Sequence, residues 1–322
     1  MSKLEKVILF IGLATFGFML YELDAAAACR MVWQVGWGMA LIIPQEAVAH
    51  LFNALGWRLA FPQEEAPSFP VWELFKLRVA GDGVNYLTPS ASIAGEITRT
   101  TMLNDSHSQE VRTSSVVIAR FCQTVAQFLC VLSGVVFIAS PLLPIEPQWR
   151  TLIPYGGGFV FLLIGGFVAF ALSSRKWIRA APQGAREAHK GLKALPHHLR
   201  HYLREHPWRL ALSVCSFSLA YIWGTFEAYW ICRFLGVPVS VMKAMAIEVL
   251  AIGIDGVFFM VPAKVGTQEG SKTAIFLLLG MNPDAGLAFG VVRHLRELFW
   301  AGSGFLLYYG HRKSALAAAK TA

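Results

Sequence analysis

The chain contains eight long apolar segments, which together occupy most of its 322 residues. An apolar stretch of about 20 residues is long enough to cross a lipid bilayer as a helix. Inside lipid a helix satisfies its backbone hydrogen bonds by itself, whereas an open sheet does not. The pattern predicts an all-α polytopic membrane protein with a single integral membrane domain over 1–322. The segments are 7–20, 32–61, 74–103, 115–143, 153–172, 210–232, 244–279 and 286–309.

The composition agrees with a membrane protein and excludes several other classes. Charged residues make up only 15% of the chain, against about 25% in soluble domains. Five cysteines are too few and too scattered to form a disulfide framework. The sequence holds no phosphate-binding loop, dinucleotide fingerprint, zinc signature or nucleophile elbow. We therefore expect neither a cofactor nor a metal, and no nucleic-acid partner for the net charge of +8.

Positive charges indicate how the chain is oriented in the membrane. The long polar stretch between 172 and 210 carries nine Lys and Arg residues but only two Glu. Loops rich in Lys and Arg face the cytoplasm. Both termini also lie in the cytoplasm if segments 74–103 and 244–279 each enter and leave the membrane on the same side. The sequence thus predicts about six full spans plus two re-entrant broken-helix hairpins, and a basic cytoplasmic amphipathic segment at 175–208 that lies on anionic headgroups. A signal peptide is the alternative for 7–20, because the small residues 25–28 follow it.

The two interrupted segments match each other at a constant offset of 173 residues. Between positions 77 and 100, seven residues are identical to those 173 positions later, and Arg99 falls on Lys272. With three full spans between the copies, the second copy enters from the opposite side. Inverted repeats with discontinuous helices are a recurring transporter design. We expect repeat one at about 70–140 and repeat two at about 243–313. The alternative is that Pro and Gly merely kink two ordinary spans.

Charged residues inside the repeated segments form the candidate binding site. A charge at the bilayer centre costs about 2.5–3.5 kcal/mol, so these groups should face a cavity or each other. One hypothesis is a cavity for an anionic headgroup, with N–H donors from helix starts near 90–94 and 263–267. The alternative is a set of ion pairs that hold the repeats together. The candidate substrate-binding residues are Arg99, Arg120, Lys272, Arg293, Glu96 and Glu269, and the candidate hairpin-breaking residues are Pro89, Gly95, Pro262 and Gly266.

These motifs resemble a known family. Residues 85–96 with Arg99 resemble the first signature of flippase-like proteins related to the transmembrane region of lysylphosphatidylglycerol synthase, and 258–270 with 293–298 resemble the second. The match is closest to the branch associated with hopanoid biosynthesis loci. It implies a bacterial inner-membrane protein that handles lipids. The soluble aminoacyl-transfer domain of the synthase is absent, so lipid lysylation is not expected. Lys264 stands where a small residue or glycine is more usual.

Together these features predict a function in lipid handling. We expect a flippase-like lipid translocase that takes a phospholipid or an isoprenoid-linked lipid into a cavity between the two hairpins. Its partners would be membrane lipids and lipid-biosynthesis enzymes. One alternative is a non-transporting membrane scaffold of a lipid-synthesis complex. Another is an integral-membrane lipid-modifying enzyme with Glu96 or Glu269 as the base, although no catalytic set accompanies these residues.

Overall fold

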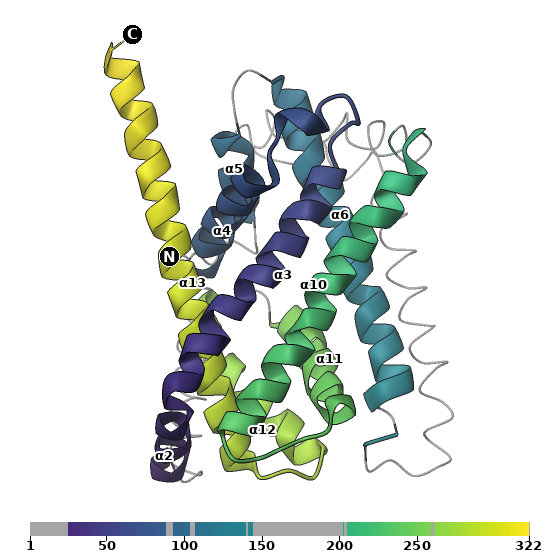
Figure 1. Ribbon diagram of the computed structural model, residues 1–322, viewed down its shortest axis with the longest axis vertical. Helices are drawn as coiled ribbons and strands as arrows, with labels where there is room; N and C mark the ends of the chain where they lie inside the picture. The colour runs from purple at the N-terminus through teal and green to yellow at the C-terminus, as the bar shows by residue number, and fades with distance from the viewer. Residues whose placement is uncertain are drawn as a thin grey trace, which may run out of the picture.

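The computed structural model is built of helices that run mostly along one long axis (Figure 1). No strand occurs in the part of the chain that it describes. Several predicted features lie outside this part. They are the spans 7–20 and 153–172, nearly all of the basic segment 175–208, and Pro89. The described residues are 25–87, 93–103, 107–139, 141–143, 202, 205–258 and 261–321.

Three continuous helical stretches in the described part are long and apolar enough to cross a membrane. The first is Arg30–Leu59, made of α2 (Ala25–Val35), a short turn η1 (Gly36–Gly38) and α3 (Met39–Leu59). The second is Gln109–Ile138, made of α6 (Gln109–Gly134) and the π-helical turn η3 (Val135–Ala139). The third is Pro207–Phe234, which is α10. They coincide with three of the predicted spans.

Each of the two interrupted segments forms a pair of helices. The first pair is α4 (Val71–Leu87) and α5 (Ile93–Met102). The second is α11 (Val241–Val257) and α12 (Thr267–Leu278), with a short turn η5 (Pro262–Lys264) between them. Figure 1 shows α4 and α5 together in the upper half of the molecule and α11 and α12 in the lower half. We call these pairs the first and second hairpins.

The first hairpin is closed by a direct contact between its two helices. Asn85 Oδ1 accepts a hydrogen bond of 2.6 Å from the backbone N–H of Gly95. A side chain at Gly95 would overlap Asn85 and the carbonyl oxygen of Gly81. Gly95 was expected at the break, but it lies inside α5 and allows α5 to approach α4 closely.

The last helix, α13 (Pro283–Thr321), packs against both hairpins through glycines. Near its start, a Cβ at Gly290 would lie 2.8 Å from Glu269 Cα in α12. Farther along, a Cβ on Gly83 of α4 would lie 2.6 Å from the carbonyl oxygen of Ala301 in α13. Small residues let helix backbones approach in this way inside membranes. One helix therefore contacts both hairpins with little side-chain material between the backbones.

The Gly290→Leu variant is expected to lower the free energy of unfolding by about 1–3 kcal/mol, because the added side chain meets the backbone of α12. Gly302→Leu is the matched control, since Gly302 lies in the same helix with no heavy atom within 4 Å of an added Cβ. Thermal unfolding in detergent measures both variants. Equal stability of the two would show that α12 and α13 do not pack as described.

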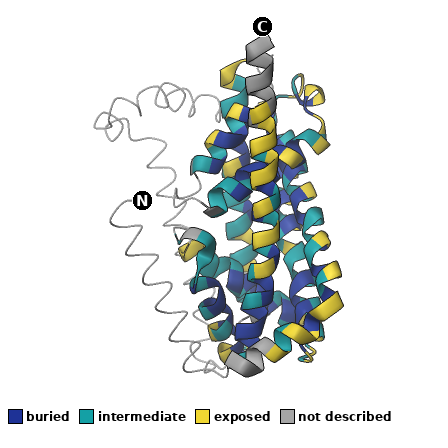
Figure 2. Ribbon diagram, turned by 90° about the vertical axis from the view of Figure 1, so that its left-hand side faces the viewer, coloured by how far each residue is buried: buried dark blue, intermediate teal, exposed yellow. Residues whose placement is uncertain are grey.

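The outward face of α13 is apolar, and its buried face carries Arg293 and Arg296 among apolar residues such as Leu287 and Phe289. Figure 2, turned so that α13 faces the viewer, shows exposed residues along this helix and buried residues behind it. Leu298, Phe299, Phe305 and Leu306 are among its large exposed side chains. Large apolar side chains on the surface of a membrane protein suit contact with lipid chains.

Candidate functional site

Each hairpin contains an aspartate that binds two bases. In the first, Asp82 accepts from Arg78 Nε at 3.1 Å and also pairs with Arg99. In the second, Asp255 pairs with Lys272 at 2.6 Å and with Lys264 at 3.7 Å. Asp82 and Arg99 are 173 positions before Asp255 and Lys272. The same cross-hairpin ion pair therefore occurs at equivalent positions of the two copies.

The first aspartate cluster also reaches helices outside the hairpin. Arg78 Nη2 donates to Gln123 Oε1 of α6 at 3.1 Å. His50 of α3 lies with its Nδ1 3.7 Å from Asp82 Oδ2, between the rings of Phe75 and Trp300. Charged groups are costly away from water unless they are paired, and here each has a partner. The cluster ties α4 to α3 and α6.

The turn of the second hairpin has an unusual backbone. Ala263 and Lys264 have φ angles of 49° and 52°, and Gly266 has 74°. Only glycine adopts this left-handed region without a steric penalty. Lys264 is nevertheless held there, because its ammonium group donates to Glu297 Oε1 at 3.0 Å and pairs with Asp255. Two charge contacts of its side chain thus accompany the strained backbone of Lys264.

Glu269 occupies the start of α12. Its Oε2 accepts from the backbone N–H of Gly266 at 3.1 Å, and its Oε1 lies 2.6 Å from His294 Nδ1 of α13. A carboxylate at this position satisfies a free N–H group and favours the positive end of the helix dipole. The N–H group of Gly266, which was expected to bind an anion, is therefore already bonded within the protein.

Arg120 differs from the other candidate bases in its exposure. It pairs with Glu96 at 3.3 Å, and its side chain is 44% exposed. Arg99, Lys272 and Arg293 are all buried. Arg120 and Arg293 are 173 residues apart, but only Arg293 is buried, so loss of the Arg120 pair would leave less buried charge.

Two arginines of α13 form a network with carboxylates from other helices. Arg293 donates to Glu227 of α10 at 2.9 Å and to Glu248 of α11 at 2.5 Å. Arg296 pairs with Glu46 of α3 and lies 3.1 Å from Glu227. Both arginine side chains are 6% exposed. The network joins α3, α10, α11 and α13 at one point.

A polar cavity of about 220 Å³ lies beside this network. Eight of its lining residues carry ionisable charges, five acidic and three basic, and they come from α3, α10, α11, η5 and α13. Uncharged side chains of α3, α6, α10 and α11 complete the wall. The charged residues are Glu46, Glu227, Glu248, Asp255, Lys264, Arg293, Arg296 and Glu297, and the others include Ala49, Asn53, Gln123, Ala220, Tyr221, Gly224 and Ile252.

The predicted binding residues lie at different places relative to this cavity. Arg293 lines it, and Lys272 contacts it through Asp255. Glu269 is bonded at the start of α12, while Arg99, Glu96 and Arg120 belong to the first hairpin and its neighbour α6. None of these four is among the lining residues.

Sequence reasoning missed the carboxylates that bind the two α13 arginines. Glu46 and Glu227 lie in segments that were interpreted through their apolar residues alone, and Glu248 lies in the second interrupted segment but matches no charged residue of the first copy. The signal was present, because a carboxylate inside an apolar run needs a partner as much as an arginine does.

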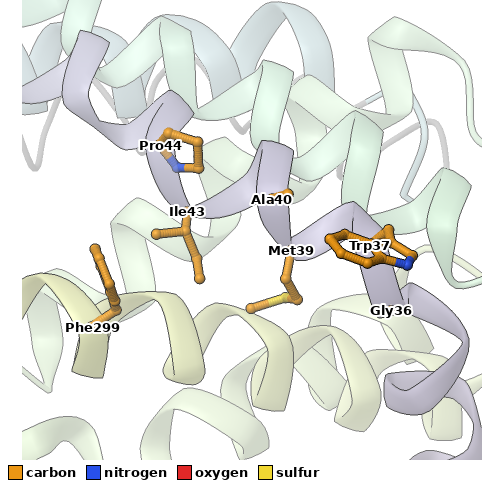
Figure 3. A pocket seen from close by; sticks show the side chains of 7 residues that line it. All are labelled: Gly36, Trp37, Met39, Ala40, Ile43, Pro44 and Phe299. Atoms are coloured by element: carbon orange, nitrogen blue, oxygen red, sulfur yellow. The ribbon is translucent and has the colours of Figure 1, made fainter.

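An apolar groove of about 660 Å³ lies one helical turn from the charged network. Figure 3 shows Met39 and Ile43 extending from α3 toward α13, and Phe299 extending from α13 toward α3. Gly36, Trp37, Ala40 and Pro44 complete its lining. No charged side chain contributes to the described wall of this groove.

Comparison with known proteins gives one match. The family model described as "Lysylphosphatidylglycerol synthase TM region" matches residues 6–303. No curated protein and no solved structure matches the chain. Among the residues that the structure describes, no group of His, Cys, Asp or Glu is arranged to hold a metal ion.

Proposed function

The chain belongs to the family of the lysylphosphatidylglycerol synthase transmembrane region, and we propose that it translocates a lipid across the membrane. The family associates it with lipid metabolism or transport in a membrane. The observation that carries the proposal is the polar cavity with its eight charged lining residues, placed among helices whose other faces are apolar.

The cavity supplies hydrogen-bond and charge partners for a lipid headgroup that crosses the bilayer. Moving a polar group through hydrocarbon is costly, because no hydrogen-bond partner is available there. The cavity replaces these lost partners with carboxylates, bases and the side chains of Asn53 and Tyr221. The substrate is a phospholipid or an isoprenoid-linked lipid, whose chains remain outside while the headgroup enters.

We further propose that the two hairpins form an inverted repeat within about six full spans. Three observations support this architecture: the offset of 173 residues, the equivalent pairs Asp82–Arg99 and Asp255–Lys272, and the placement of the two hairpins in opposite halves of the molecule. In this arrangement both termini are cytoplasmic, and the protein resides in a bacterial inner membrane.

Arg120 does not line the cavity, but among the candidate binding residues it is the one whose partner is most readily exchanged for a phosphate. Its ion pair with Glu96 is the most exposed of the four candidate pairs. Arg99, Lys272 and Arg293 act in this proposal by holding the hairpins and the cavity wall in position, because carboxylates already bind them.

Filling the cavity tests the function directly. In vesicles that contain the protein and a fluorescent phospholipid or isoprenoid-linked lipid, dithionite quenching follows lipid movement between leaflets. Asn53→Trp is expected to lower the rate by about tenfold, which corresponds to roughly 1.4 kcal/mol added to the barrier. The expected cause is steric, since Asn53 lines the cavity.

The matched control is Leu51→Trp, on the same helix but at a side chain that is 41% exposed. It should translocate lipid like the wild type. If the wild-type protein moves no lipid above the rate of protein-free vesicles, the transport proposal is wrong, and a non-transporting scaffold becomes the better hypothesis.

A further inference from the structure

The groove between α3 and α13 has the properties of a site for an apolar chain. Its described wall consists of aliphatic, aromatic and thioether side chains with two glycine or alanine positions. Trp37 is 93% exposed and Phe299 is 52% exposed, so both present large apolar surfaces outward. The volume falls within the roughly 300–1,000 Å³ that is usual for small-molecule sites.

The polar cavity begins close to the groove, at residues that are near the groove lining in both helices. Glu46 is three residues after Ile43 in α3, and Arg296 is three residues before Phe299 in α13. Residues three apart lie on one face of a helix, about one turn along its axis. Glu46 and Arg296 form an ion pair, and both line the cavity. This pair therefore stands between the apolar groove and the polar cavity.

A hydrogen bond holds the two helices together at the same level. Trp300 Nε1 of α13 donates to the carbonyl oxygen of Ile43 in α3 at 2.9 Å. Pro44 follows directly and lacks an N–H group, so α3 loses one of its internal hydrogen bonds here. The contact between α3 and α13 thus includes one cross-helix hydrogen bond, one ion pair and the ring contact of His50 with Trp300, beside a weakened turn.

We propose that this groove binds one acyl chain of a membrane lipid, and that the Glu46–Arg296 pair is the gate through which the headgroup reaches the cavity. An amphiphilic molecule fits the apolar groove and the neighbouring polar cavity, because its chain meets only apolar groups and its polar end meets charges one turn away. This inference rests on the proposed function but concerns a different site, since the chain occupies the groove whether or not the headgroup crosses.

Photocrosslinking tests occupancy of the groove without requiring transport. The protein is reconstituted in phosphatidylethanolamine and phosphatidylglycerol vesicles with a trace of phosphatidylglycerol that carries a diazirine in one acyl chain. After irradiation, mass spectrometry locates the modified peptides. We expect adducts concentrated on Met39, Ala40, Ile43 and Phe299, in excess of those on exposed α10 residues such as Leu212 and Leu219.

Two variants separate the groove from the gate. Ala40→Trp fills the groove and is expected to lower these adducts by about tenfold, whereas Leu51→Trp, on the same helix outside the groove, leaves them unchanged. Glu46→Gln weakens the ion pair with Arg296 but leaves the lining of the groove unchanged. We therefore expect the acyl-chain adducts to persist while the translocation rate changes.

The outcomes distinguish this proposal from the proposed function. Adducts spread evenly over α3, α10 and α13 would overturn the groove proposal. Concentrated adducts with no lipid movement by the wild type would support the groove and reject translocation. Because the wild-type adduct map is informative alone, the proposal does not depend on correct folding of any variant.

Discussion

Replacing Arg293 with methionine is expected to lower the free energy of unfolding by about 3–5 kcal/mol, the usual cost of removing one partner from a buried ion pair. Glu227 and Glu248 are buried and both accept from this guanidinium. Without it, Glu248 loses this guanidinium partner and Glu227 keeps its contact with Arg296. Thermal unfolding in detergent, checked by the fraction of monodisperse protein on a sizing column, measures the loss.

A control variant and a triple variant test whether the lost stability comes from the unpaired carboxylates. Arg233→Met, at the exposed end of α10, removes the same charge and should change stability by no more than about 0.5 kcal/mol. The triple variant Arg293→Met, Glu227→Gln, Glu248→Gln removes the carboxylate charges as well and should recover part of the loss. A single Arg293→Met variant as stable as the wild type would mean that the network contributes nothing to the fold.

The two hairpin aspartates are expected to behave alike. Asp82→Asn leaves Arg78 and Arg99 without their shared carboxylate, and Asp255→Asn does the same to Lys264 and Lys272. Each variant should lose about 3 kcal/mol, at the low end of the buried-pair range, because both aspartates are partly exposed. Comparing the free energies of unfolding of the two variants shows whether equivalent positions of the repeat contribute equally to stability.

A double variant that removes both charges of one ion pair tests this second prediction. Asp255→Asn combined with Lys272→Met removes both charges and should be more stable than Asp255→Asn alone, since a buried ammonium without a partner is the costly species. Asp284→Asn, at the start of α13, serves as control, with a loss of only about 0.3–1 kcal/mol from the helix dipole. If the double variant is the less stable one, the charge explanation is wrong.

The helices were predictable from the sequence because their signal is local. Apolar runs and the Pro and Gly that interrupt them predicted an all-α membrane protein, and the three long apolar helices of the described part confirm that class. Gly95 shows the limit of this reasoning. Its residue type suggested a break, but a glycine also allows close packing, and only the contact with Asn85 distinguishes the two roles.

The ion pairs were less predictable because they join residues that are far apart in the chain. Glu96 and Arg99 lie three apart in α5, a spacing that places them on one helical face. Arg99 instead binds Asp82 across the hairpin, and Glu96 binds Arg120 of α6. The partners of Arg293 are 66 and 45 residues away. No sequence pattern encodes these distances, since they depend on how the helices pack.

The glycine contacts of α13 have a mechanical consequence. Gly290 lies against the backbone of α12, and Ala301 and Gly304 lie against the backbone of α4, so few flexible side chains remain to absorb a displacement. Packed helices slide by small shear steps rather than deforming continuously. A shift of the first hairpin must therefore move α13, and α13 must carry the second hairpin with it. The two hairpins are therefore mechanically coupled through α13.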